Sequence, residues 1–266
     1  MTNYTLLSDP QPVIGRQWSK DSSPERRQLL GLARDALLFI DVTGQRYYFE
    51  DFRKTSGAST LHQSEGSEGF TGLRERLNKS AELFARLRDE PESEAERELI
   101  QVILDALRFI SSTGQLNAFG EYLEHIEASG PPYVVAAFAT KEEAEAWLKQ
   151  RPHPPDSASI LIGNTYHDVV HDADAHVLRL PHSRILECYL SELKKEHPPS
   201  AVASFGNLEE ATAWLQSLSE PARWAWVLIA GKFYLAAYYR NIHHRTLHPL
   251  SMGKDSESAP QGAPQP

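Results

Sequence analysis

A tandem repeat in the second half of the chain constrains the fold more than any other feature of the sequence. Residues 134–148 read VVAAFATKEEAEAWL, and residues 201–215 read AVASFGNLEEATAWL. Nine positions are identical at a fixed offset of 67 residues, and the same offset aligns ILI at residues 160–162 with VLI at residues 227–229. A gap-free match of this length indicates an internal duplication, so the two copies are expected to share one fold.

Each copy predicts a βαββ unit. A strand of β-branched and aromatic residues opens the copy. A helix then follows a capping residue, Thr140 or Asn207, and acidic side chains occupy its first turn. Two further strands are joined by two-residue turns at residues 163–164 and 230–231, which contain the glycine or asparagine that a tight hairpin favours. We expect the strands of both units to join one mixed sheet, because one unit alone has few strands.

The first half of the chain predicts helices only, because its apolar residues recur three and four positions apart. A weaker repeat, at an offset of 70 residues, places the pattern DALxFIxxTGQ at residues 35–45 and at residues 105–115. Each copy predicts a long helix, a turn at TGQ and a second, aromatic helix. This repeat indicates a duplicated helical hairpin.

These patterns predict an α+β fold, in which an all-α helical N-terminal half is followed by two tandem βαββ repeats joined by a helix. The predicted segments are a loosely ordered N-terminus (1–22), a helical domain (23–129) with a flexible loop (55–69), a duplicated domain (130–252) with units 133–181 and 201–250 and a linker helix (182–196), and a disordered tail (253–266). Small and polar residues dominate both the loop and the tail.

The composition argues against several classes of protein. The chain has 266 residues and a formal net charge of -9. Nucleic acid and anionic membrane surfaces need a cationic partner, so neither is an expected partner. The one cysteine, Cys188, cannot form an internal disulfide, and its apolar neighbours favour a small core residue. Residues 1–9 lack the features of a signal peptide, and no stretch reaches the roughly 20 apolar residues of a membrane span, so we expect a cytoplasmic protein.

A His/Asp-rich stretch in the first copy is the feature most easily mistaken for a metal site. Its members are His167, Asp168, His171, Asp172, Asp174 and His176. The second copy carries histidines near the corresponding place, at His243, His244 and His248. We interpret the stretch as a strand, in which two histidines four positions apart are separated by about 13 Å, too far to share one ion. The sequence therefore predicts no metal site.

No pattern in the sequence predicts catalysis or a cofactor. The chain lacks the G-x-S-x-G, H-E-x-x-H, P-loop and G-x-G-x-x-G patterns. A Ser–His–Asp triad has scattered members, so spacing alone neither finds nor excludes one. We therefore expect a protein that is not an enzyme, and a His/Asp metal-dependent hydrolase is the least favoured alternative.

The final hairpin, residues 224–240, is rich in the residue types that dominate protein interfaces. Strand alternation places Phe233, Leu235 and Ala237 on one face, which is the expected core side. The opposite face and the turn after it form the predicted partner-binding surface: Tyr234, Tyr238, Arg240, His243, His244 and Arg245. Packing of these side chains on a helix of the same chain is the alternative that the sequence leaves open.

Two stretches carry a resemblance to a known family. One is the helical module SPERRQLLGLARDALLFIDVTGQRYYFEDF. The other is the doubled AFATKEEAEAWL and SFGNLEEATAWL unit with its ending GKFYLAAYYRNIHHRTLHPLS. Over about residues 23–252 the chain resembles myxobacterial cytoplasmic immunity proteins of the swarming-inhibition (Sit) type. It departs from their pattern by an extra helical segment at about residues 56–115.

The resemblance implies stoichiometric binding to a cognate protein toxin, a lipoprotein exchanged between cells, without catalysis. An acidic immunity protein suits a basic toxin such as a nuclease, because charge complementarity speeds the encounter. The resemblance assigns no binding residues to this chain. A protein-binding scaffold or regulatory module is the alternative, and a toxin gene immediately upstream would favour the immunity function.

Overall fold

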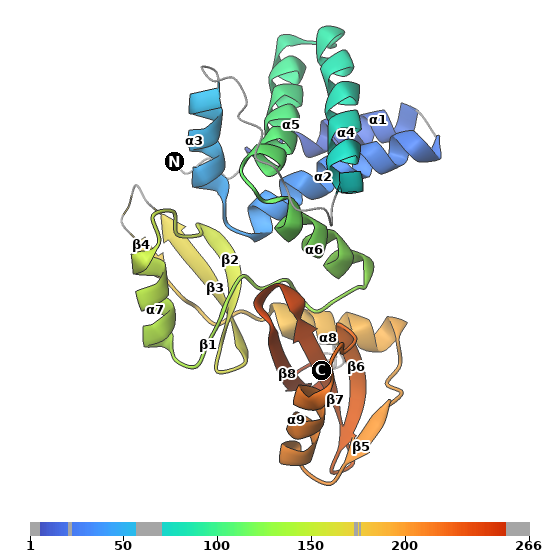
Figure 1. Ribbon diagram of the computed structural model, residues 1–266, viewed down its shortest axis with the longest axis vertical. Helices are drawn as coiled ribbons and strands as arrows, with labels where there is room; N and C mark the ends of the chain where they lie inside the picture. The colour runs from blue at the N-terminus through green and yellow to red at the C-terminus, as the bar shows by residue number, and fades with distance from the viewer. Residues whose placement is uncertain (1–5, 21–22, 57–70, 173–174, 176, 254–266) are drawn as a thin grey trace, which may run out of the picture.

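The protein has the predicted α+β fold, with a helical half followed by two sheets and their helices (Figure 1). The structure is a computed structural model that describes these residues of the 266-residue chain: 6–20, 23–56, 71–172, 175 and 177–253. Most of the predicted flexible loop, from residue 57 onward, lies outside the described residues. The predicted disordered tail lies outside them from residue 254.

Two helical hairpins form the centre of the first half. The helices of this half are α1 (Gln11–Lys20), α2 (Pro24–Val42), α3 (Arg46–Ser56), α4 (Thr71–Asp89), α5 (Glu94–Ser112) and α6 (Leu116–Glu127). In both TGQ turns the threonine hydroxyl donates to the carbonyl four positions earlier, at 2.5 and 2.6 Å, and accepts a bond from the glutamine amide at 2.8 and 2.9 Å. The middle glycine has a φ of +66° at Gly44 and +75° at Gly114, which glycine adopts without strain. The predicted helical duplication is therefore confirmed.

The two hairpins pack on each other reciprocally. Phe39 of α2 lies against Phe119 of α6, with ring centroids 5.4 Å apart. Phe109 of α5 lies against Phe49 of α3 at 5.5 Å. This pair is equivalent to the first one, because Phe109 corresponds to Phe39 and Phe49 corresponds to Phe119 at the 70-residue offset. Phe39 also contacts the aromatic ring three residues further along α6 at 5.5 Å, and Phe109 contacts the ring three residues further along α3 at 5.3 Å. The hairpins are thus related like the halves of a twofold dimer, and their buried rings form the core.

The structure corrects the prediction for the N-terminal residues 1–22. Gln11–Lys20 forms helix α1, whose Val13 and Ile14 are buried in the helical core. Arg16 of the same helix bonds Glu96 of α5 at 2.8 Å. The segment is polar overall, but its few apolar residues lie on one face and suffice to dock the helix. Residues 1–5 and 21–22 lie outside the described residues.

Each repeat forms its own four-stranded sheet, so the expected single mixed sheet is wrong. The first repeat contains β1 (Ala137–Phe138), α7 (Lys141–Gln150), β2 (Ser157–Ile162), β3 (Thr165–Asp172) and β4 (Val177–Arg179). The second contains β5 (Ala203–Phe205), α9 (Leu208–Ser217), β6 (Trp224–Ile229), β7 (Lys232–Tyr239) and β8 (His244–Pro249). The repeat unit is βαβββ, with one strand more than the predicted βαββ pattern, and this extra strand makes each sheet large enough to stand alone.

The strand register of the first repeat recurs in the second at the 67-residue offset. The pair Phe138 and Ile162 becomes Phe205 and Ile229, and the added fourth strand follows the same rule. Both turn residues have a positive φ in both hairpins, as predicted for residues 163–164 and 230–231. The duplication therefore determines register as well as topology, because a slip by one residue would turn every buried side chain to the other face.

Helix α8 (Ile185–Glu196) joins the two repeats and is shared by their cores. Leu190 of α8 is fully buried beside Tyr166 of the first repeat and Tyr239 of the second. The opposite face of each sheet is covered by the helix of its own repeat, α7 or α9. Both faces of each sheet are therefore buried. Cys188 of α8 is exposed, so its interpretation as a core residue is wrong.

The two repeats dock on different helices through the same sequence position, where they carry opposite charges. Asp156 of the first repeat lies 3.0 Å from the Arg46 Nε of α3, and both side chains are buried. Its counterpart in the second repeat, Arg223, donates to Glu121 and Glu124 of α6 at 2.7 and 3.2 Å. An exchange of the two repeats would oppose like charges, so this pattern specifies which repeat packs on which hairpin.

The N-caps of α7 and α9 provide a matched stability test. The Thr140 hydroxyl accepts from the Glu143 backbone amide at 3.3 Å, and the Asn207 side-chain oxygen Oδ1 accepts from the Glu210 backbone amide at 2.9 Å. We expect Thr140→Ala and Asn207→Ala each to lower the free energy of unfolding by about 1 kcal/mol, because one helix-end N–H loses its partner. Urea unfolding measures the change, and Lys149→Ala, at an exposed position, is the control. A change no larger than that of the control would contradict the capping role.

Candidate functional site

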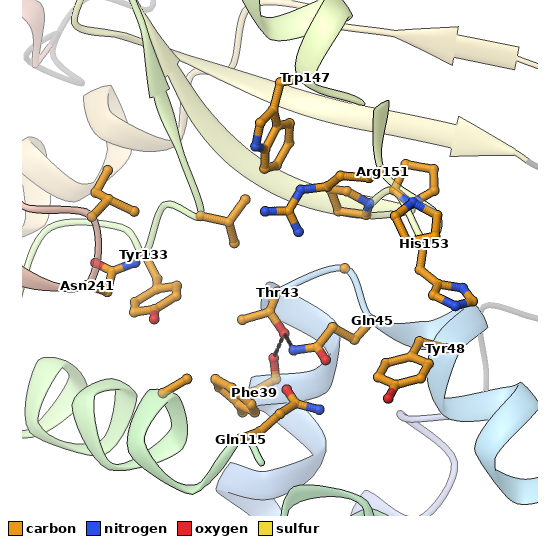
Figure 2. A pocket seen from close by; sticks show the side chains of 17 residues that line it. Phe39, Thr43, Gln45, Tyr48, Gln115, Tyr133, Trp147, Arg151, His153 and Asn241 are labelled. Carbon is orange, nitrogen blue, oxygen red and sulfur yellow. Dashed lines mark hydrogen bonds between the residues drawn. The ribbon is translucent and has the colours of Figure 1, made fainter. Parts of the chain in front are cut away.

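A cleft of about 580 Å³ lies where the helical half meets the first repeat. Its walls come from the α2–α3 turn, the start of α6, the loop after α7 and the short helix η2 (Arg240–Ile242) of the second repeat. Figure 2 shows side chains from these segments converging on one space. Segments far apart in the sequence thus form one site, whose volume is typical of pockets that bind ligands.

The two TGQ turns form the helical side of the cleft. Gln45 and Gln115 hold the same position in the two hairpins, and both line the cleft because the hairpins pack reciprocally. Gly44 lies directly against Pro155, and a methyl group on Gly44 would come within 2.5 Å of the Pro155 Cβ. The Asp156 amide also donates to the Gly44 carbonyl at 3.1 Å. These contacts fix the loop after α7 on the turn.

Trp147 and Arg151 form the opposite wall. The Arg151 Cζ lies 4.2 Å from the centre of the Trp147 ring, a cation–π distance. Figure 2 shows the guanidinium pointing into the space between Trp147 and the α2–α3 turn. Within the described part of the chain this guanidinium contacts no carboxylate, and no other Arg, Lys, Asp or Glu lines the cleft. The cleft therefore carries a positive charge whose hydrogen-bond donors face open space.

Further aromatic rings complete the two ends of the cleft. Tyr48 of α3 stacks on His153 with ring centroids 5.0 Å apart. At the other end, burial raises the pKa of Tyr133 to about 12, so its hydroxyl stays protonated at neutral pH. Asn241 of η2 lies beside it and donates to the Val134 carbonyl at 2.7 Å. The site thus combines one cation, several aromatic faces and neutral polar groups.

The predicted partner-binding residues in the second repeat mostly make contacts within the chain. Arg245 stacks on Tyr238 at 4.9 Å and donates to the carbonyls of Leu215 and Gln216 at 3.2 and 2.7 Å, so it caps the C-terminus of α9. Tyr234 is partly buried in the core beneath α9. For these three residues the geometry matches the alternative of internal packing.

The other predicted residues connect the second repeat to its neighbours. Arg240 bonds Glu124 of α6 at 3.1 Å, and the His244 Nε2 lies 2.9 Å from the Asn164 Oδ1 in the first repeat. His243 is exposed and has a left-handed φ of +51°. The six residues are not gathered into one surface. Partner contact by any of them stays a prediction, and the cleft is the better-formed candidate site.

The His/Asp-rich stretch forms a strand, as predicted. His167 and His171 lie in β3, and the His167 Nδ1 is 3.2 Å from the Leu180 carbonyl. Asp174 and His176 lie outside the described residues. Among the residues that the structure describes, no three His, Cys, Asp or Glu side chains are grouped to hold a metal ion.

Neither Trp147 nor Arg151 was identified as a site residue from the sequence. The signal that could have pointed to Arg151 is the divergence of the repeats just after the helix, whereas Trp147 has an identical counterpart in the second copy. Residues 151–155 read RPHPP in the first copy, whereas residues 218–222 read LSEPA in the second. Four of these five positions differ between the copies, and the segment lines the cleft in the first copy.

Comparisons with known proteins do not place this chain in a family. No family model, no curated protein and no solved structure matches it. In the described ranges, no helix is both long and apolar enough to cross a membrane.

Proposed function

We propose that this protein is a cytoplasmic immunity protein that neutralises a cognate bacterial toxin by stoichiometric binding, without turnover. We further propose that the cleft between the helical half and the first repeat anchors the toxin. The observation that carries this proposal is the Arg151 guanidinium stacked on Trp147 in a cleft with several aromatic walls. Trp, Tyr and Arg supply most of the binding energy in protein interfaces, chiefly in concave, well-packed positions.

Two properties of the sequence support the same function. The resemblance of residues 23–252 to the swarming-inhibition immunity proteins implies a toxin as partner. The formal net charge of -9 suits a basic toxin such as a nuclease, because the summed field of the protein steers an oppositely charged partner and raises the association rate.

The duplication offers a matched pair of variants. Trp147 and Trp214 occupy the same position in the two repeats, and each packs on the phenylalanine of its first strand, with centroids 5.3 and 5.2 Å apart. Trp147 lines the cleft, whereas Trp214 does not. We expect Trp147→Ala to weaken toxin binding by about 2 kcal/mol or more, a factor of about 30, and Trp214→Ala to leave it almost unchanged.

Calorimetric titration with the toxin domain that the proposed function expects to be encoded beside this gene measures the affinity, and survival of toxin-exposed cells measures the protection. Urea unfolding should show losses of stability of the same order in the two variants, because both lose the contact with the phenylalanine of the first strand; Trp147→Ala also loses the Arg151 stack. An equal loss of binding in both variants would move the binding site away from the cleft. A wild-type protein that neither binds nor protects against that toxin would exclude the immunity function.

A further inference from the structure

The chemistry of the cleft specifies one group of its ligand. The Arg151 guanidinium is planar and stacks on Trp147, which leaves the N–H donors at its edge directed into the cleft (Figure 2). A stacked guanidinium loses little further freedom when it binds, and its fork of donors matches the two oxygens of a carboxylate. A ligand that buried this cation without pairing it would bind less tightly, because the guanidinium would lose its hydration without gaining a partner.

Charge counting favours a carboxylate over a phosphate. Arg151 is the only Arg or Lys among the described residues that line the cleft, and the other polar side chains there include Gln45, Gln115 and His153. Sites for phosphorylated ligands normally cluster several cationic side chains around the dianion. One guanidinium balances one carboxylate, whereas it would leave a phosphate dianion partly uncompensated.

The second repeat shows what an arginine looks like when it serves internal packing. Arg245 also stacks on an aromatic ring, but it donates to two backbone carbonyls at the end of α9. At the position equivalent to Arg151 the second repeat carries Leu218. Arg151 is therefore absent from the common plan of the repeat, and no bond within the described residues accounts for it.

The remaining walls specify what lies next to the carboxylate. Trp147, Tyr133 and Tyr48 offer aromatic faces around the cation, and the volume of about 580 Å³ exceeds what one acidic side chain fills. Apolar or aromatic side chains gain most from burial against such faces. The cleft thus fits a short segment in which an acidic residue adjoins an apolar one.

We propose that Arg151 binds an Asp or Glu side chain of the toxin, with an adjoining apolar residue of the toxin held against Trp147. This inference rests on the proposed function, since it identifies the anchoring group of the partner. The cleft is then a local exception to the charge pattern of the protein. The net negative charge attracts a basic toxin, whereas the cleft selects for one acidic residue on that toxin.

The first experiment measures toxin binding by Arg151 variants. We expect Arg151→Gln to weaken binding by about 30-fold or more, and Arg151→Lys to weaken it by a smaller factor, because a lysine keeps the charge but not the fork. Lys149→Gln is the matched control. It removes one positive charge at the exposed C-terminal end of α7, two residues before Arg151 and outside the cleft, and it should change binding less than about 3-fold. Melting curves verify that the variants fold.

A double-mutant cycle then identifies the partner residue. Among the acidic residues of the toxin, one neutral substitution should weaken binding to the wild-type protein and have little further effect on Arg151→Gln. Wild-type affinity in Arg151→Gln, an equal loss in Lys149→Gln, or additive effects for every acidic residue would overturn the proposal. If Trp147→Ala weakens binding while Arg151→Gln does not, the immunity function stands and the carboxylate inference fails.

A dipeptide probe tests the chemistry without the toxin. N-acetyl-Glu-Tyr-amide at millimolar concentration should shift the indole N–H resonance of Trp147, whereas N-acetyl-Gln-Tyr-amide should not. The shift should be lost in Arg151→Gln. Equal shifts from both dipeptides, or none from the acidic one, would overturn the proposal. If the shift depends on the carboxylate but the protein binds no toxin encoded beside its gene, the site chemistry is supported and the immunity function fails.

Discussion

Gly44→Ala is expected to lower the free energy of unfolding by about 3 kcal/mol, because two effects act at this position. Gly44 has a φ of +66°, and this left-handed conformation is strained for an alanine. The new methyl group would also lie 2.5 Å from the Pro155 Cβ and 2.8 Å from the Ser157 carbonyl oxygen. These atoms belong to the backbone and to a rigid ring, so the whole segment has to move away from the α2–α3 turn.

Gly114→Ala separates the two effects. Gly114 holds the same position in the second hairpin and has a φ of +75°, but no described atom outside its own turn lies within 4 Å of the position that a methyl group would take. This variant should therefore lose only about 1 kcal/mol, the cost of the left-handed conformation. Urea unfolding measures both losses, and calorimetric titration with the toxin should show weaker binding for Gly44→Ala alone, since Arg151 lies on the displaced segment. Equal losses of stability would contradict the close contact with Pro155.

The two duplications made much of the fold predictable from the sequence. Copies that match at a fixed offset have to satisfy the same hydrogen bonds, so evidence from one copy strengthens the interpretation of the other. The TGQ motif illustrates this: either copy alone is a weak turn signal, but the pair predicted both hairpins. The fourth strand was missed in both repeats, because β4 has only three residues and the six residues of β8, HRTLHP, are mostly polar and give no clear alternating pattern.

The candidate site was not predictable in the same way. Periodicity reports which face of an element is buried, but it does not report which elements meet. The partner surface at Tyr234 and Tyr238 was inferred from strand alternation, which assumes that one face of the sheet is open. Because α8 and α9 cover both faces, that assumption fails. The cleft depends on docking contacts, such as the Arg46–Asp156 pair, that no local pattern encodes.

Acidification is expected to destabilise the protein through His248. Burial lowers the pKa of His248 to about 4, below its ordinary value of 6.5. Its Nε2 lies 3.1 Å from the Tyr239 hydroxyl, which in turn lies 2.7 Å from the Tyr166 hydroxyl, and Tyr166 donates to the Pro132 carbonyl at 2.9 Å. A neutral histidine that donates from Nε2 satisfies this whole chain. The folded state therefore keeps the imidazole neutral at pH values where the unfolded chain protonates it.

The sign of the effect follows from proton binding. Between pH 6.5 and pH 4 the unfolded state binds more protons at His248 than the folded state, so stability is lost as the pH falls. The loss should be about 2 kcal/mol at pH 5 and about 3 kcal/mol at pH 4. Burial raises the pKa values of Asp35, Asp41 and Asp156, which favours the folded state on acidification and opposes this trend. A variant is therefore needed to isolate the histidine.

His248→Gln isolates this contribution, because glutamine keeps an N–H donor for Tyr239 but does not titrate. The variant should be less stable than the wild type at pH 7, since the imidazole is fully packed. Its disadvantage should shrink by about 2 kcal/mol when urea unfolding is repeated at pH 5, because only the wild type carries the cost of a neutral histidine. All other titrating groups are common to both proteins and cancel in the difference. Parallel stability curves from pH 7 to pH 5 would show that His248 does not control the acid sensitivity of the shared core.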